Sequence, residues 1–283
     1  MTTEEIVAKV KNLAPVSHAA LRLVSLLDQA AVSNDEIVQV LKYDTVLTAK
    51  LLRACNSPYF GFEDPVSSVE QAVLVLGHQQ ILHLVLSLAF SGAMNTPLPG
   101  YAAEGGELWR HSLTTAMASE TLTRSGLPVE FETPVAFTAG LLHDIGKLVF
   151  NHVLDDAAQL AIRSRITDGK LARTDAEREI VGADHAEVGA HLLRSWKLPD
   201  DIVEAVGRHH QPTCQPRPKL SVVTHVGNCL AHLVGSTLGW EGYAVRADAA
   251  ATEALAITPE KLEDLMIAVH DAAAKVEHFM HVS

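Results

Sequence analysis

The sequence is poor in several kinds of residue, and each shortage argues against certain structural or functional classes. Aromatic residues make up only 5% of the 283 residues, and the three cysteines, Cys55, Cys214 and Cys229, include no Cys-x-x-Cys pair. Such cysteines argue against a disulfide framework or structural zinc and favour a reducing compartment. Lys and Arg number 22 against 34 Asp and Glu, which gives a net charge of -12. Because binding to phosphate backbones depends on clustered basic residues, we expect no nucleic-acid partner.

Long apolar runs are also missing. The best membrane candidate, ILHLVLSLAF at residues 81–90, contains a histidine. It is too short to span a bilayer, so it predicts a buried helix. The opening residues, MTTEEIVAKV, lack the basic start and apolar stretch of a secretory signal. We therefore expect a cytoplasmic protein without a membrane partner.

Helical spacing of apolar residues recurs almost throughout the chain, whereas strand-like alternation is nearly absent. The expected fold class is all-α, with many helices. The stretch NTPLPGYAAEGG interrupts the periodicity with two prolines and three glycines. We predict an N-terminal helical subdomain at 1–95, a linker at 96–106, a second helical subdomain at 107–240, and a C-terminal loop and helix packed on it at 241–283.

One helix of the second subdomain is predicted from its start signal. Thr174 and Glu177 have the spacing of a capping box. We expect them to begin a long helix that extends to about Trp196 and holds His185 in its middle.

The stretch GLLHDIGKLVF, residues 140–150, puts polar residues in an apolar run. A His-Asp pair occurs twice in the chain, at His143-Asp144 and His270-Asp271, and we interpret the second as a chance copy on the surface. A helix ending at Gly146 would let His143 and Asp144 reach one pocket. A buried His-Asp pair without partners would be costly, so further polar groups are expected around the first pair.

Candidate partners are imidazoles and carboxylates, which bind borderline and hard divalent metals. Glu107 and His111 lie four residues apart and share a helix face. Lys147 would place a mobile positive charge beside the pocket, which suits a phosphate ester. Taken singly, each candidate also fits a structural role, such as a solvated helix face or a histidine at a helix C-terminus. The remaining candidates are His185, His209 and His210.

The series His111, HDIGK at 143–147, His185 and His209-His210 resembles the HD superfamily of metal-dependent phosphohydrolases, with the spacing of its HD-GYP branch. The first third, with LAPVSHAALRLVSLL, LKYDTVLTAKLLRACNSPYFG and VSSVEQAVLVLG, resembles the HDOD family of bacterial signalling modules. Together the resemblances cover roughly residues 8 to 240. They imply an all-helical regulatory module with Lys147 facing a phosphate and Asp144 in a catalytic role. The metal ligands that they imply are Glu107, His111, His143, Asp144, His185, His209 and His210.

Two departures from the family pattern argue against efficient catalysis. Asn228 stands where the HD pattern has its final aspartate, and no Gly-Tyr-Pro follows Gln211. We expect a signalling module that binds one or two divalent ions, such as iron or manganese, and an unidentified protein partner or small phosphate-containing ligand. The alternatives are a metal-dependent phosphohydrolase acting on a nucleotide or other phosphate ester, and a structural or iron-sensing metal site. The sequence does not indicate the oligomeric state.

Overall fold

The fold is helical, as predicted. The computed structural model describes residues 3–8, 18–26, 33–58, 60–62, 64–168, 171–214, 219–239 and 246–280. Within these ranges the chain forms helices and no strand, and Leu98 and Ala103 form an isolated β-bridge. The all-α class is therefore confirmed. The division of the chain at residues 95, 106 and 240 stays a prediction.

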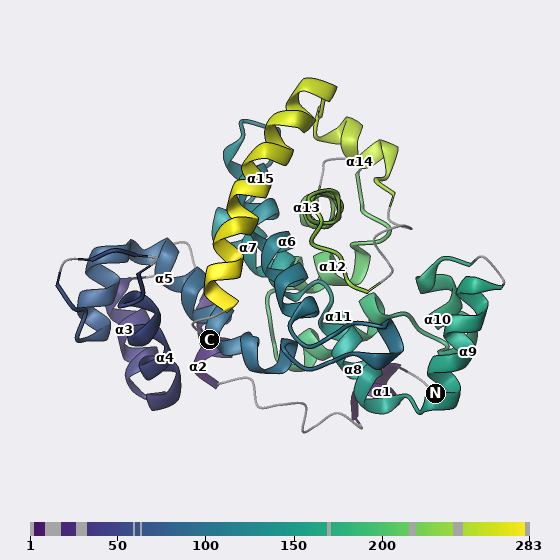
Figure 1. Cartoon of the computed structure of the whole chain (residues 1–283), viewed down its shortest axis with the longest axis horizontal. Coiled ribbons are helices and arrows are strands. Elements are labelled where there is room, and N and C mark those ends of the chain that lie inside the picture. Colours follow the sequence, from purple (N-terminus) through teal and green to yellow (C-terminus); the bar gives the residue numbers. More distant parts are fainter. Residues whose placement is uncertain are drawn as a thin grey trace.

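Three short helices of the N-terminal part pack against one long helix, and α3 and α4 lie at one end of the molecule (Figure 1). Asn56, from the motif CNSPYFG, closes the loop before the long helix, because its side chain bonds the backbone N–H of Val66 at 2.7 Å and its carbonyl at 2.8 Å. The first helix, by contrast, packs against α8 and α11 of the second half. The helices are α1 (Thr3–Ala8), α2 (His18–Leu26), α3 (Asn34–Lys42), α4 (Thr45–Cys55) and α5 (Val69–Met94).

Helix α5 connects the two halves of the chain. Gly77 has a φ of 77° and kinks the helix, and the apolar stretch after it packs on α6 and α7. Among the described residues, α5 alone is long and apolar enough to cross a membrane, but half of its most apolar window is buried inside the protein. Residues 81–88 are all buried, as predicted for this stretch.

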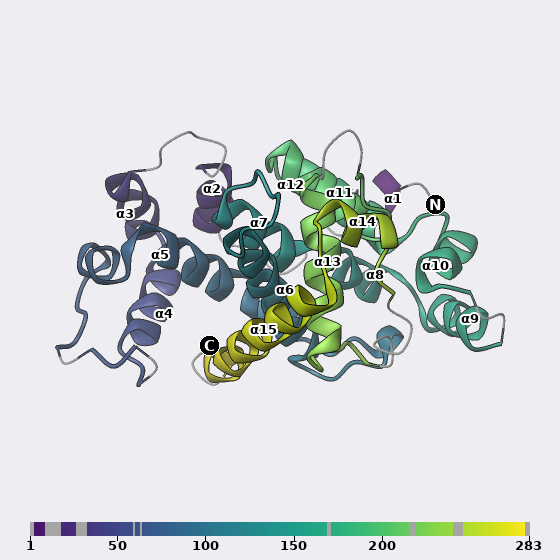
Figure 2. The same cartoon turned by 90° about the horizontal axis from the view of Figure 1, so that it is seen from above.

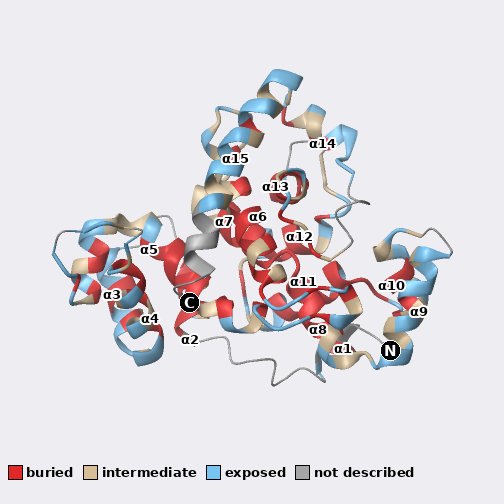
Figure 3. Ribbon diagram, viewed as in Figure 1, coloured by how far each residue is buried: buried red, intermediate tan, exposed pale blue. Residues whose placement is uncertain are grey.

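The second half surrounds α6, which contacts α7, α13 and α15, while α11 lies between α8 and α12. Figure 3 shows the buried residues concentrated in this central bundle, and Figure 2 shows α9 and α10 at the end opposite α3. The elements are η1 (Pro99–Tyr101), α6 (Glu107–Arg124), α7 (Thr133–Leu142), α8 (Ile145–Val153), α9 (Asp156–Thr167), α10 (Arg173–Val181), α11 (His185–Ser195), α12 (Asp200–Arg208), α13 (Leu220–Leu233), α14 (Ala249–Ala254) and α15 (Pro259–Met280). Residues 241–245 of the predicted C-terminal loop lie outside the described residues, as does residue 240 before it.

The prediction of one long helix from Thr174 to Trp196 is wrong, because this stretch forms two helices. Gly182, with a φ of 92°, ends α10, and Asp184 then caps α11 in a capping box with Glu187. A left-handed glycine at this position stops a helix because the backbone turns away from the helical path. His185 therefore stands at the first residue of α11 rather than in the middle of a helix.

Candidate metal centre

His143 and Asp144 form the turn between two buried helices. Helix α7 ends at Leu142 and α8 begins at Ile145, so the predicted helix end at Gly146 is wrong. The exposed fractions of the His143 and Asp144 side chains are 0% and 1%. Because the chain changes direction between the two residues, both side chains reach the same buried space, and Asp144 Oδ2 lies 3.4 Å from His143 Nε2.

Gly146 does not end a helix, as was predicted, but allows α8 and α11 to pack closely. A Cβ atom at this position would lie 1.9 Å from the backbone oxygen of His185, so only glycine fits between α8 and α11. Gly189 of α11 faces it, and a Cβ there would lie 3.2 Å from the Gly146 nitrogen. The close approach of these two helices brings the start of α11, and with it His185, next to Asp144.

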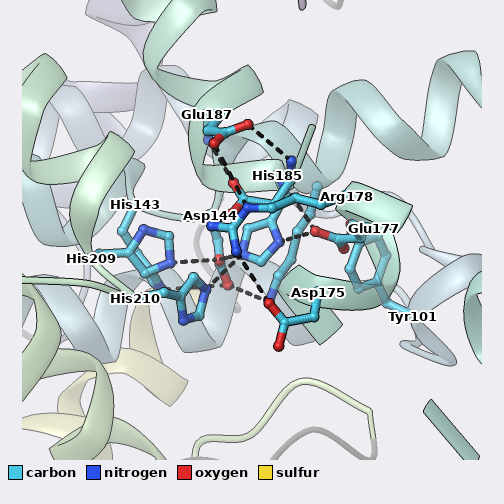
Figure 4. Close-up of polar contacts among 12 residues, drawn as sticks. Tyr101, His143, Asp144, Asp175, Glu177, Arg178, His185, Glu187, His209 and His210 are labelled. Carbon is cyan, nitrogen blue, oxygen red and sulfur yellow. Dashed lines mark hydrogen bonds and ion pairs between the residues drawn. The ribbon is translucent and has the colours of Figure 1, made fainter. Parts of the chain in front are cut away.

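Four imidazoles lie around the Asp144 carboxylate, and Figure 4 shows those of His143, His185 and His209. Oδ2 lies 3.4 Å from Nε2 of His143 and 3.7 Å from Nε2 of His111. Oδ1 lies 3.4 Å from Nε2 of His185 and 3.7 Å from Nε2 of His209. These side chains come from α6, the α7–α8 turn, the start of α11 and the end of α12, so only the tertiary fold brings them together.

The other ring nitrogen of three of these histidines is bound to a backbone carbonyl. Nδ1 lies 2.7 Å from Ser236 O in His111, 2.8 Å from Gly140 O in His143 and 2.7 Å from Val206 O in His209. A carbonyl oxygen can only accept, so each Nδ1 donates, and the Nε2 atom on the other side of each ring is left to face the centre. Within the described part of the chain, these Nε2 atoms have no hydrogen-bond partner. Metal-binding histidines are held in this way in proteins.

His185 is held by a carboxylate instead, which sequence reasoning missed. Its Nδ1 lies 2.6 Å from Oε2 of Glu177, which also accepts the backbone N–H of His185 at 2.9 Å. Tyr101 donates its hydroxyl to the second oxygen of Glu177 at 3.0 Å. Glu177 is thus a buried partner of His185 and not a helix cap. No local pattern indicates this role, because a helix end separates the two residues.

His210 extends the cluster towards the surface. Its Nε2 lies 2.9 Å from Nε2 of His185, and the residue itself is exposed. Ligand atoms within 4.8 Å of one another form two groups that could each hold a metal ion, and Asp144 belongs to both. The groups are Asp144, His185, His209 and His210, and His111, His143 and Asp144.

Glu107 lies outside both groups. It is half-buried in the first turn of α6, where its Oε2 accepts the backbone N–H of Gly239 at 3.1 Å. The predicted helix face shared with His111 exists, but the carboxylate is bound to the chain that follows α13 instead of pointing at Asp144. The structure thus brings together six of the seven predicted ligands.

Lys147 is buried, whereas a mobile charge was expected. Its Nζ lies 2.8 Å from Asp144 Oδ2 and 5.4 Å from the centre of the Tyr101 ring. Residues 96–106 therefore contribute to the site through the buried Tyr101. The Lys147 ammonium is the nearest counter-charge of the Asp144 carboxylate.

The family is decided by the length of the match. The family model described as HDOD domain matches residues 13–212 of the chain. The chain belongs to the HDOD family. The three stretches expected to resemble that family, between Leu13 and Gly77, lie within the match.

Solved structures share the fold of this HDOD protein. An HDOD domain protein of unknown function from Geobacter sulfurreducens has a TM-score of 0.70 at 22% identity, over 97% of this chain and 96% of that chain. A candidate signal transduction protein from Marinobacter aquaeolei VT8 has a TM-score of 0.78 at 21% identity, over 100% of this chain and 61% of that chain. An uncharacterized protein of Treponema pallidum (strain Nichols) is 22% identical over 244 residues, which are 82% of this chain and 45% of that protein. The HDOD protein spans less than half the length of the curated relatives it matches.

The charges of the HDOD cluster suit a metal ion. Burial would raise the pKa of Asp144, but the charges of His143 and Lys147 hold it well below its usual range, so this carboxylate is ionised. Burial and the neighbouring histidines lower the pKa values of His111 and His209. These rings are therefore neutral at pH 7, which is the form that binds metals. For His185, burial alone would lower the pKa, but Glu177 and Asp144 raise it to about 10.

Asn228 of the HDOD protein is buried in α13, with 5% of its surface exposed. Its Oδ1 makes no hydrogen bond within the described ranges of the chain. A buried amide oxygen without a partner is costly, and a ligand at the site would remove that cost.

The loop after His210, where no Gly-Tyr-Pro was found, is described only in part. Its residues 215–218 lie outside the described residues.

Proposed function

We propose that this HDOD protein is a metal-binding regulatory module of bacterial signal transduction. In this proposal the cluster around Asp144 holds one or two divalent ions, such as iron or manganese. One observation carries the proposal: the imidazoles of His111, His143 and His209 direct Nε2 at one ionised carboxylate, while their Nδ1 atoms are fixed by carbonyls. The free buried thiols of Cys55 and Cys229 suit the reducing environment of the cytoplasm.

The residues present fit a metal without any change of fold. His185, His209 and His210 would share one ion with Asp144, and His111 and His143 would share another. A bound divalent ion would polarise a ligand oxygen or lower the pKa of a bound water. The charge that Asp144 now receives from Lys147 and the protonated His185 would then be supplied by the metal.

The residues of the cluster favour the binding of a metal ion over the hydrolysis of a substrate. Asn228 is a neutral amide and adds no negative charge to offset two cations. The Lys147 ammonium is already bound to Asp144. A groove of about 640 Å³ opens beside His210 and includes Arg178, Arg194 and Arg208 in its lining, but Asp144 and His143 do not line it. A ligand in this groove would meet the cluster at its exposed histidine.

The same groove supports a second candidate function. A metal-dependent phosphohydrolase needs an approach for an anionic substrate, and three arginines lie beside the exposed histidine of the cluster. The same groove is also lined by Asp184, Glu187, Asp200 and Glu204, so such a substrate would have to bind at the arginines. A nucleotide or another phosphate ester bound there would be next to the metal ligands. This candidate requires that the substrate displaces or reorients His210.

The test is the metal content of untagged protein, measured by elemental analysis. We expect about one metal ion or more per chain in the wild type, and none in the His143→Ala, Asp144→Ala double variant. The matched control is His270→Ala, Asp271→Ala, which removes the second His-Asp pair from the exposed side of α15 and should keep the metal. A metal-free wild type, after purification without chelator and incubation with Fe²⁺ or Mn²⁺, would refute the proposal.

The second candidate has its own readout. Hydrolysis of bis(p-nitrophenyl) phosphate by the metal-loaded wild type, lost in the double variant but kept in the control, would favour the hydrolase. Metal binding without hydrolysis of this ester would favour the regulatory module.

A further inference from the structure

Helix α13 runs along the cluster and presents one face to it. His225, Asn228 and His232 are three and four residues apart, so their side chains lie on the same side of the helix. At one end of this face, His225 Nδ1 donates to the backbone oxygen of His209 at 2.8 Å. At the other end, the ring centre of His232 lies 4.6 Å from that of His111. Asn228 lies between these two contacts and therefore faces the cluster too.

His232 is as close to its neighbour as the rings that make up the cluster are to one another. The ring centres of His111 and His143 are 5.1 Å apart, and those of His143 and His209 are 5.0 Å apart. Compared with these, the 4.6 Å between His111 and His232 is a short separation. The chain that follows α13 also fixes His111, because the backbone oxygen of Ser236 accepts its Nδ1–H at 2.7 Å.

One turn after the amide of Asn228, the same face of α13 thus carries the imidazole of His232. Asn228 is buried and can contribute only a neutral oxygen, which binds divalent metals less strongly than a carboxylate does. His232 is partly exposed in the last turn of the helix. Its Nδ1 atom is nevertheless buried, and its ring lies against that of His111.

We propose that His232 is a further metal ligand, which joins His111, His143 and Asp144 and replaces the carboxylate that Asn228 lacks. This inference rests on the proposed metal-binding function. It also specifies the class of ion. Three imidazoles and one carboxylate favour Fe²⁺, Co²⁺, Ni²⁺ or Zn²⁺ over the oxygen-preferring Mg²⁺ and Mn²⁺. At this one of the two ion positions, the inference therefore narrows the proposed iron or manganese to iron.

Cobalt(II) titration of the metal-free full chain tests the inference, because Co²⁺ absorbs visible light according to its ligands. We expect His232→Ala to weaken Co²⁺ binding by about tenfold or more at one site and to change the visible spectrum, since the loss of even an outer partner costs about this much. His270→Ala, which removes an exposed histidine of α15, is the control and should behave as the wild type. Circular dichroism verifies that each variant is folded.

The outcomes separate this inference from the proposed function. A wild type that binds Co²⁺, with a His232→Ala variant of equal affinity and identical spectrum, would overturn the role of His232 alone. A wild type that binds no Co²⁺ would overturn the metal-binding function and the role of His232 with it.

A second variant tests whether Asn228 and His232 serve the same ion. In the His232→Ala background, Asn228→Asp should restore Co²⁺ affinity, because it returns a carboxylate to the face of α13 that lies against the cluster. Failure to restore the affinity would contradict the placement of both residues at one metal.

Discussion

Glu177 and His185 form a buried carboxylate–imidazole pair, with 2.6 Å between Oε2 and Nδ1. The exposed fractions of the two side chains are 0% and 1%, and His185 Nε2 on the other side of the ring lies 3.4 Å from Asp144. A carboxylate behind a histidine fixes the ring orientation and increases its basicity as a ligand. The pair therefore links α10 to the cluster, although α10 supplies none of the ligands in the two groups described above.

Glu177→Gln should weaken metal binding by about 10- to 100-fold, because the amide no longer holds His185 through a charged hydrogen bond. Competition with a chromophoric chelator measures the affinity. Glu179→Gln on the same helix removes an exposed carboxylate that pairs with Arg165, and it should leave the affinity unchanged. Equal affinities for all three proteins would contradict this role of Glu177.

Gly146→Ala should destabilise the protein by about 3 kcal/mol or more, because the new methyl group would overlap the backbone oxygen of His185 and force α8 from α11. Urea unfolding measures the loss. Gly92→Ala in α5 is the matched control, since a Cβ there meets no atom within 4 Å. It should be neutral or stabilising by up to about 1 kcal/mol. Similar losses in both variants would show that the close approach of α8 and α11 is unimportant.

Asp144→Ala should cost the metal-free protein about 3 to 5 kcal/mol of unfolding free energy, because the buried charges of Lys147 and His185 lose their common partner. Adding Lys147→Met should recover part of this loss, since it removes one uncompensated charge. The non-additivity of the two substitutions in urea unfolding is the measurement. Purely additive effects would mean that the ammonium and the carboxylate are not coupled.

The stability of the protein should fall as the pH falls, in part through a histidine outside the cluster. His83 is buried and stacks on Phe137 with 4.0 Å between ring centres. Burial, and to a lesser extent the charge of Arg124, lowers its pKa to about 3. In the unfolded chain a histidine has a pKa of about 6.5. Between these values only the unfolded chain binds the proton, so the unfolding free energy decreases as the pH falls through this window.

Substitution of His83 isolates this contribution. From pH 7 to pH 5, the wild type should lose about 2 kcal/mol more unfolding free energy than His83→Gln, which cannot titrate. Metal-free protein and urea unfolding at both pH values provide the comparison. His270→Gln, at an exposed position, should show the full wild-type loss. The prediction fails when His83→Gln and the wild type lose the same amount.

Local sequence patterns predicted the features that depend on neighbouring residues in the chain, namely helix formation and the burial of apolar stretches. The spacing of apolar residues predicted helices, and the run at residues 81–90 was correctly expected to be buried. Family resemblance placed six cluster residues in the right order along the chain. The same local reasoning failed at Thr174 and Glu177, because a capping-box spacing does not show whether the glutamate faces solvent or the core.

The sequence by itself determined the helical class, which follows from the spacing of apolar residues. It also determined the family and the candidate histidines and aspartate, through the resemblance of its motifs to known families. Only the tertiary structure decided which side chains meet. The contact between Gly146 and Gly189 brings His185 to Asp144, the end of α10 brings Glu177 behind it, and Glu107 instead binds the chain after α13. A hydrogen bond or an ion pair acts over a few ångströms, and such distances between separate helices are set by how the helices pack.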